Sequence, residues 1–291
     1  MPFCAGCDTY VKRNKINTML GEDDYEEIYC KECLDEELKN ENLIDNPDSF
    51  YFLSEKNDDE LFMGFELEVE REYDIGIQSE KFIRFLRGEK VSTIFFLKED
   101  GSLDNGFEIV SHPFTLRYAK NHLNFKKMLN WLHKHKFNDG KGNAGLHIHI
   151  NRRFLTNEDV IKMRMFFSLN EEQLFVFSKR GDENNYCKYE EFDEYFLKDL
   201  STQEERRYAL NITNDNTIEM RIFNHTLNYS RFMAYLEFAD ALTRYCKNNT
   251  LSDVLQQTNR RKSWNCFVKY VKANKYKYLS KILKKDNLLC V

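Results

Sequence analysis

The chain has 291 residues, of which 42% are hydrophobic, 14% aromatic and 31% charged. This composition supplies enough apolar surface for one large packed domain with a small appendage, and it excludes a wholly disordered chain. The first residues lack a basic segment followed by an apolar run, and no stretch approaches the roughly 18 apolar residues of a membrane span. We therefore expect a cytoplasmic protein that has no membrane partner.

The net charge of −5 conceals a strongly basic C-terminal segment. From Asn259 to Lys285 there are ten Lys or Arg residues and no Asp or Glu, so the remainder of the chain carries −15. Such a segment can bind nucleic acid or an acidic partner. We favour a solvated outer face on helices whose opposite side is an apolar stripe of these residues: Trp264, Phe267, Val268, Val271, Leu279 and Ile282.

Two C-x-x-C pairs lie close together near the N-terminus, Cys4 with Cys7 and Cys30 with Cys33. Four thiolates at this spacing suit a tetrahedral structural Zn²⁺, and a segment this short needs the metal in order to fold. Four unrelated buried cysteines are the alternative, but two such pairs seldom arise by chance so close together. The remaining cysteines are expected to be ordinary reduced thiols: Cys187, Cys246, Cys266 and Cys290.

The local patterns predict an α+β fold with a mainly antiparallel sheet. Strands are predicted at 61–70, 92–98, 106–111, 144–151, 207–213 and 216–223, with hairpin turns before 106 and at Asn214-Asp215. Helices are predicted at 115–136, from an N-cap at Thr156, and across most of 228–285. The expected parts are a zinc-binding module (1–40), a polar connector (41–60), a catalytic domain (61–258) and a basic helical segment (259–291).

Three of these strands pair an apolar face with a face of metal-binding or anion-binding side chains. The polar faces carry Glu66, Glu68 and Glu70; His147, His149 and Asn151; and Glu219 and Arg221. Each strand alone fits the solvent face of a half-exposed sheet. Two carboxylates about 7 Å apart, however, repel by about 2 kcal/mol at an effective dielectric constant of about 20, and divalent cations would reverse that cost. Carboxylates mixed with imidazoles favour Mg²⁺ or Mn²⁺, and an arginine beside them suits a phosphate.

Seven segments in this order resemble the amidoligase family, relatives of glutamine synthetase and of glutamate–cysteine ligase. They are G-F-E-L-E (64–68), D-G-S-L (100–103), F-E-I-V-S-H-P (107–113), G-L-H-I-H-I-N (145–151), K-R-G-D-E-N-N-Y-C-K (179–188), R-Y-A-L-N (207–211) and T-I-E-M-R-I-F (217–223). The resemblance runs from about Gly64 to Leu227. The cysteine pairs and the basic segment lie outside it.

The resemblance implies a glutamine-synthetase-like funnel, built from an antiparallel sheet flanked by helices, with ATP at one end and the substrates at the other. Glu68 and Glu108 would hold the metal nearer the substrate. Glu66, His147 and Glu219 would hold the metal on the ATP phosphates. The implied activity is an ATP- and Mg²⁺-dependent ligase that joins a carboxylate to an amine on small-molecule, peptide or protein substrates, with Mn²⁺ as the alternative metal.

The resemblance also implies groups that bind the phosphates and the substrate. Arg221 would contact the transferred phosphoryl group, and His149 would lie nearer the nucleotide. Arg207 and Arg180 would bind phosphate or a substrate carboxylate. Two further motif positions, Asp100 and Asn211, receive no role.

Two other classes of function remain open on the sequence. The same carboxylates and H-x-H pair would serve a metal-dependent hydrolase or nuclease, which turns over without ATP. Alternatively, the zinc module and basic segment would form a non-catalytic module that binds nucleic acid or protein, a partner class we favour less. No G-x-x-x-x-G-K-[ST] loop and no G-x-S-x-G motif is present, and Cys187 lacks a neighbouring histidine that would activate it as a nucleophile.

Overall fold

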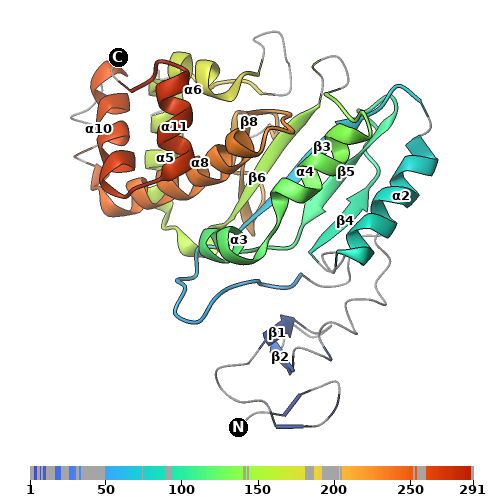
Figure 1. The fold of residues 1–291 in the computed structure, drawn as a ribbon. Helices are drawn as coiled ribbons and strands as arrows, with labels where there is room; N and C mark the ends of the chain where they lie inside the picture. Colours follow the sequence, from blue (N-terminus) through green and yellow to red (C-terminus); the bar gives the residue numbers. More distant parts are fainter. Residues whose placement is uncertain are drawn as a thin grey trace. The chain divides into compact units, whose positions relative to one another are not determined.

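The chain forms two compact units, Met1–Gly140 and Lys141–Val291. The computed structural model describes these residues: 3, 4, 7, 9, 10, 17–20, 26–30, 33, 50–73, 75–89, 94–139, 142, 144–180, 187–191, 203, 205–251, 253 and 260–289. Figure 1 shows the elements of both units in the order of the sequence. For 17–20, 26, 27, 29, 76, 77, 80, 260 and 261 the backbone alone is described.

Three antiparallel strands and three helices build the main part of the first unit. The strands β4 (Phe95–Lys98), β5 (Gly106–Ser111) and β3 (Met63–Glu70) are hydrogen-bonded neighbours in that order. The helices are α2 (Ile75–Gly88), α3 (Leu116–His122) and α4 (Phe125–Lys134). The predicted strands and the hairpin before 106 are confirmed, although 92 and 93 lie outside the described residues.

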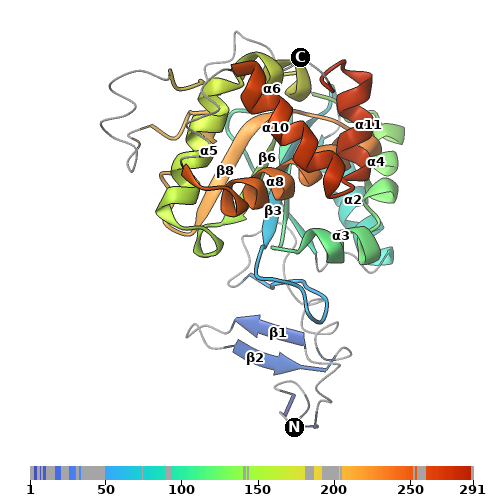
Figure 2. The ribbon, with the colours of Figure 1, turned by 90° about the vertical axis from the view of Figure 1, so that its left-hand side faces the viewer.

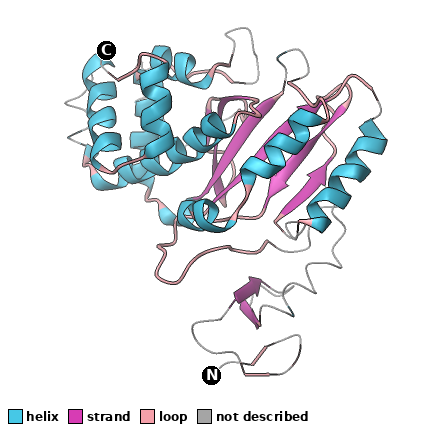
Figure 3. Ribbon diagram, in the orientation of Figure 1, coloured by secondary structure: helices cyan, strands magenta, loops and turns pink. Residues whose placement is uncertain are grey.

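The first unit places its aromatic core between this sheet and the helices α2 and α4 (Figure 1, Figure 3). Phe65 of β3 lies 5.7 Å from Phe125 of α4, measured between ring centroids. Phe82 of α2 lies 5.1 Å from Trp131 of α4 and 6.2 Å from Phe107 of β5. The apolar side of β3 is therefore fully covered, as its alternating pattern predicts.

The single helix predicted at 115–136 is wrong, because this stretch forms two helices. Leu123 adopts an extended conformation (φ −95°, ψ 117°) between α3 and α4. The side chain of Asn124 then accepts a hydrogen bond from the Lys127 amide at 3.2 Å and caps α4. Asparagine favours this capping role over a place inside a helix, so the chain breaks here despite its apolar periodicity.

A short hairpin lies between the two cysteine pairs. Strand β1 (Asn17–Leu20) pairs antiparallel with β2 (Glu26–Tyr29), with Asn17 opposite Tyr29. The second strand leads directly into Cys30.

In its described residues, the second unit also contains three antiparallel strands, in the order β6 (Gly145–Asn151), β8 (Thr217–Asn224) and β7 (Leu210–Asn211). Its helices are α5 (Asn157–Leu169), α6 (Glu171–Ser178), α8 (Tyr229–Asn248), α10 (Arg260–Ala273) and α11 (Lys277–Lys285), with a 3₁₀ turn at Arg152–Phe154. The hairpin predicted around Asn214-Asp215 is confirmed, but β7 is shorter than the predicted strand 207–213.

The helices of the second unit pack through one continuous aromatic cluster. Phe177 of α6 and Phe238 of α8 lie 6.3 Å and 5.9 Å from Phe223 of β8. Phe238 also lies 5.4 Å from Phe267 of α10. The apolar stripe predicted on the C-terminal helices is buried throughout. Among the described residues, no helix combines the length and apolar character that crossing a bilayer demands.

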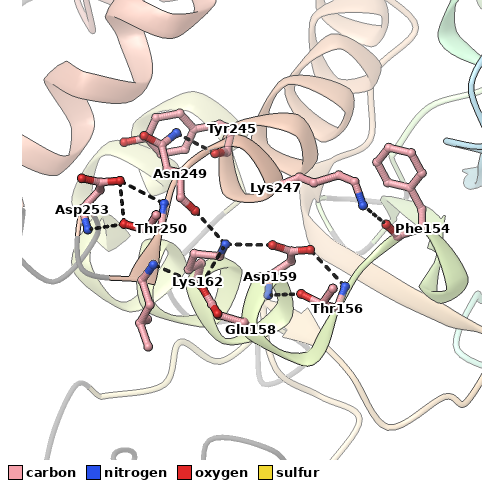
Figure 4. Close-up of polar contacts among 11 residues, drawn as sticks. Phe154, Thr156, Glu158, Asp159, Lys162, Tyr245, Lys247, Asn249, Thr250 and Asp253 are labelled. Carbon is pink, nitrogen blue, oxygen red and sulfur yellow. Dashed lines mark hydrogen bonds and ion pairs between the residues drawn. The ribbon is translucent and has the colours of Figure 1, made fainter.

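Buried polar contacts join the start of α5 to the end of α8 (Figure 4). Thr156 and Asp159 form the capping box that begins α5, which confirms the predicted N-cap. Lys162 is only 3% exposed, and its Nζ donates to the carbonyl of Asn249 at 2.7 Å and pairs with Asp159 at 2.8 Å. A cation at the carboxyl end of α8 complements the helix dipole and satisfies a terminal carbonyl.

Candidate active site

Three ionisable side chains form a row across the strands of the first unit. Glu68 of β3 lies directly opposite Glu108 of β5, and Glu108 lies opposite Lys98 of β4. The Lys98 Nζ is 3.4 Å from the Glu108 Oε2. Like charges placed directly opposite on neighbouring strands destabilise a sheet. One lysine, nearly half of whose side chain is exposed, only partly compensates this pair of carboxyl groups.

Asp100, in the turn between β4 and β5, joins these two glutamates in an acidic cluster of Glu68, Asp100 and Glu108. One carboxylate oxygen from each residue lies within 4.8 Å of the others. Oxygen ligands of an octahedral Mg²⁺ lie about 2.1 Å from the ion and therefore up to about 4.2 Å apart. Glu68 and Glu108 are each only 5% exposed, so the cluster differs from acidic groups scattered on a surface. Its donor set suits a hard divalent cation.

The acidic cluster retains a proton at neutral pH. Burial, followed by the charge of Glu66, raises the pKa of Glu108 to about 8, although Lys98 acts in the opposite direction. Burial also acts to raise the pKa of Asp100, but hydrogen bonds from Ser102 and the interactions with Glu108 and Lys98 outweigh it and hold that pKa below its usual value. A bound cation would take the place of the proton on Glu108.

A second row crosses the strands of the second unit and combines Asn211, Glu219 and His149; we call it the mixed row. Asn211 of β7 and His149 of β6 both lie opposite Glu219 of β8. The Asn211 Nδ2 donates to the Glu219 Oε2 at 2.8 Å. The Asn211 Oδ1 accepts from the amide and hydroxyl of Thr213 at 3.0 and 2.8 Å. Because both ends of its amide are engaged, Asn211 fixes the orientation of the Glu219 carboxylate.

His147 and Arg221 approach the same carboxylate from a β-bulge. The β6–β8 register shifts between Leu146 and Ile148, so that Arg221 and the next residue of β8 oppose His147. The His147 Nδ1 lies 3.3 Å and the Arg221 Nη1 2.5 Å from the Glu219 Oε1. Simple alternation along the strands did not predict this bulge.

Glu219 is ionised although it is buried. Burial acts to raise its pKa, but the charges of His147, His149 and Arg221 and the hydrogen bond from Asn211 outweigh burial and hold the pKa below its usual value. The carboxylate therefore remains an anion within a cationic environment. Such a group is ready to accept hydrogen bonds or coordinate a cation without first losing a proton.

The two other predicted arginines occupy different environments. Arg180 is 5% exposed, and its Nη1 donates to the carbonyl of Arg221 at 2.6 Å. Gly145 permits this approach, because a Cβ at that position would lie 2.6 Å from the Arg180 Nη1. Arg207 is exposed, and its carbonyl accepts a hydrogen bond from the Lys188 amide. Arg180 thus holds the backbone of the bulge that carries Arg221.

Two further residues that lie within the motifs, Cys187 and His112, have structural roles in this geometry. Burial raises the pKa of Cys187 to about 11, despite the opposing charges of Arg180 and Arg221, so the thiol is a poor nucleophile near neutral pH. His112 accepts a hydrogen bond from the Tyr51 amide at 3.2 Å, and burial lowers its pKa to about 3. The neutral imidazole therefore anchors the segment that precedes β3.

The four N-terminal cysteines lie together, with one Sγ atom from each within 4.8 Å of the others. The Cys7 and Cys30 sulfurs are 3.9 Å apart, and the Cys30 amide donates to the Cys4 Sγ at 3.1 Å. Four sulfurs about 2.3 Å from a tetrahedral Zn²⁺ would be separated by about 3.8 Å. All the cysteines that the structure describes are free thiols. The cluster has the donors and the spacing to hold a metal ion.

No family model and no curated protein matches the chain. Among solved structures, the chain is similar to a bifunctional glutathione synthetase from Pasteurella multocida, with 9% sequence identity and a TM-score of 0.39. The similarity covers 78% of this chain, which spans 46% of that protein's chain. A likeness at this score carries no inference about fold or activity, so the resemblance to amidoligases rests on the motifs.

Proposed function

We propose that the protein is an ATP- and Mg²⁺-dependent ligase that joins a carboxylate to an amine through an acyl phosphate. The observation that carries the proposal is the acidic cluster, in which buried carboxyl groups from neighbouring strands converge on one point. Burying such groups is costly unless a cation compensates them. The motif resemblance singles out two of its three members, Glu68 and Glu108, as metal ligands.

In this proposal Glu68, Asp100 and Glu108 hold a Mg²⁺ or Mn²⁺ ion near the substrate. Glu66, together with His147 and Glu219, would hold a second ion on the ATP phosphates, as the resemblance implies. These ions would neutralise charge on the phosphates and the attacking carboxylate. Asn211 fixes the Glu219 carboxylate for that task through its hydrogen bond.

The reaction has two steps. A substrate carboxylate oxygen attacks the γ-phosphorus of ATP, and the bond from that phosphorus to the bridging β-oxygen breaks as ADP leaves. The amine nitrogen then attacks the acyl carbon, inorganic phosphate leaves, and the nitrogen loses a proton. Arg221 would donate charge-assisted hydrogen bonds to the transferred phosphoryl group.

The remaining predicted residues would bind and orient the reactants. His149 would lie near the nucleotide, and Arg207 would bind phosphate or a substrate carboxylate from the surface. The contact from Arg180 to the Arg221 backbone supports a positioning role for Arg180. Its burial leaves it less suited to direct contact with a substrate.

To test the ligase activity, the full chain is incubated with ATP, Mg²⁺ and a pool of amino acids or a cell extract. We expect ADP to form together with a product whose mass equals the two substrates minus water, detected by mass spectrometry. Glu68→Ala should abolish both signals, whereas Glu72→Ala, at an exposed position just beyond β3, should keep them. ATP left untouched across a broad panel, or hydrolytic products formed without ATP, would overturn the ligase assignment.

We also propose that Cys4, Cys7, Cys30 and Cys33 hold a structural Zn²⁺. Elemental analysis of the purified chain should give about one zinc per molecule, as expected for a single four-cysteine site. Cys30→Ser should lose the metal, whereas Cys187→Ser should retain it. Equal zinc content in the two variants would contradict the assignment.

A further inference from the structure

The two C-terminal helices, α10 and α11, carry a row of exposed lysines that the proposed ligase chemistry does not use. Three lysines on α10 and three of the four exposed lysines on α11 make up what we call the lysine surface: Lys262, Lys269, Lys272, Lys281, Lys284 and Lys285. The helices are joined by three residues, with Lys275 in the left-handed region at φ 58°. They therefore form one helical hairpin at the end of the chain.

The lysines lie opposite the buried side of each helix. Phe267 and Val271 of α10, and Leu279 and Leu283 of α11, are fully buried. Both helices lie against α8 (Figure 1, Figure 2). At 100° per residue, the lysines of each helix project away from this apolar side. The lysine surface therefore faces outward.

The charge of this surface is not compensated within the described part of the chain. None of its six lysines forms an ion pair with a residue that the structure describes. The first acidic residue after α11, Asp286, is occupied by Arg231 at 2.9 and 3.0 Å. The spacings of Lys281 to Lys285 and of Lys269 to Lys272 place like charges side by side, which weakens a helix. A face kept only for solubility normally mixes both signs.

We propose that the lysine surface binds the phosphate backbone of a nucleic acid without reading its sequence. Lysines act as point charges toward phosphates, and rows of them supply the electrostatic part of nucleic-acid binding. A membrane fits less well, because the apolar sides of both helices are buried and no large hydrophobic side chain is exposed on their described residues. Binding to an acidic protein instead is an outcome that the experiment below distinguishes. This inference is independent of the proposed ligase activity.

The experiment measures binding of the full chain to fluorescein-labelled 20-nucleotide RNA and DNA, single-stranded and duplex, by fluorescence anisotropy between 50 and 300 mM KCl. We expect affinity to fall with salt, and the RNA and DNA arms show which backbone is preferred. Replacing Lys281, Lys284 and Lys285 with Gln should weaken binding about tenfold or more at 100 mM KCl, and should reduce the salt slope on duplexes by about 3. These side chains are exposed, so the thermal unfolding midpoint should change little.

The matched control replaces Lys56, Lys126 and Lys134, exposed lysines of the first unit, with Gln. It changes the net charge by the same amount and should leave binding nearly unchanged. Equal losses in the two triple variants would show a general charge effect and overturn the proposal. Tighter binding to phosphatidylserine vesicles or to polyglutamate than to any nucleic acid would overturn it as well.

Discussion

Each unit has a buried glutamate at the centre of a row of side chains that crosses three strands. The surroundings raise the pKa of one of these glutamates and lower that of the other. In the acidic cluster, Glu108 faces another glutamate, and burial together with Glu66 raises its pKa to about 8. In the mixed row, Glu219 is equally buried but is surrounded by imidazole, guanidinium and amide groups, which hold its pKa below the usual value. The neighbouring side chains, rather than the degree of burial, therefore determine whether each glutamate is ionised.

This difference indicates which row depends on an added cation. In the mixed row, Arg221, the imidazoles and Asn211 already compensate the Glu219 carboxylate, so the row does not need a metal for its charge balance while ATP is absent. The acidic cluster must keep a proton or bind a cation, because buried like charges cannot all remain ionised. Substitutions of the two glutamates should therefore change stability in opposite directions.

The largest effect should follow Glu219→Gln. The amide fills the same volume but leaves Arg221 and the two imidazoles without their central anion, and it places an NH₂ group among donors. We expect a loss of about 4 kcal/mol in the free energy of unfolding, measured by urea denaturation. Glu191→Gln, at an exposed site in the same unit, should change it by less than about 0.5 kcal/mol. Similar stabilities for the two variants would show that the cationic groups need no anion.

The opposite sign is expected for Glu108→Gln. Its folded-state pKa lies near 8 against an ordinary value of 4.5, so the folded wild type keeps a proton that the unfolded chain releases. The contribution of Glu108 is therefore fully present below about pH 4.5 and is lost as pH rises toward 8. In buffer free of divalent cations, Glu108→Gln should be more stable than the wild type by about 3 kcal/mol at pH 7 and about equal to it at pH 4.5. A constant difference across this range would contradict the assignment.

In the absence of ATP, divalent cations should stabilise the protein through the acidic cluster, because the second proposed ion would be held on the ATP phosphates. At 100 times the dissociation constant, Mn²⁺ should stabilise the wild type by about 2.7 kcal/mol, seen as a higher thermal midpoint. The effect should be larger at pH 8.5 than at pH 6.5, because the proton on Glu108 must leave first. Glu68→Gln should lose the response, whereas Glu72→Gln should retain it. An undiminished response in Glu68→Gln would place the cation elsewhere.

The sequence predicted the elements of both rows better than their detailed geometry. Alternation along 61–70, 144–151 and 216–223 identified the strands and the polar side of each, because an antiparallel sheet buries side chains with period two. The capping pattern at Thr156 and the helical spacing of apolar residues near the C-terminus likewise predicted the N-cap of α5 and the buried stripe of the C-terminal helices. These features depend on local spacing, which a single sequence contains.

Features that depend on contacts between distant residues could not be predicted in this way. The bulge opposite His147 arises from the register of two strands that are far apart in sequence, and no local pattern marks it. The roles of Asp100 and Asn211 likewise appear only when their neighbours are in place. The break at Leu123 had a local signal, the Asn124 cap, but the apolar periodicity of 115–136 outweighed it in the prediction.

The smallest effect should follow substitution of Asn211, and it would show whether a mixed row can be turned into an acidic one. Asn211→Asp removes the N–H donor to Glu219 and places a carboxylate opposite it, so we expect a loss of about 1.5 kcal/mol. Asn211→Ala removes the donor without adding charge and should cost about 1 kcal/mol. The Asp variant should gain more stability than the Ala variant as pH is lowered toward 4 or Mn²⁺ is added, because it creates a new pair of carboxylates in addition to the acidic cluster that both variants keep. If Ala and Asp responded alike to pH and to Mn²⁺, the orientation of Glu219 rather than its charge would be what Asn211 controls.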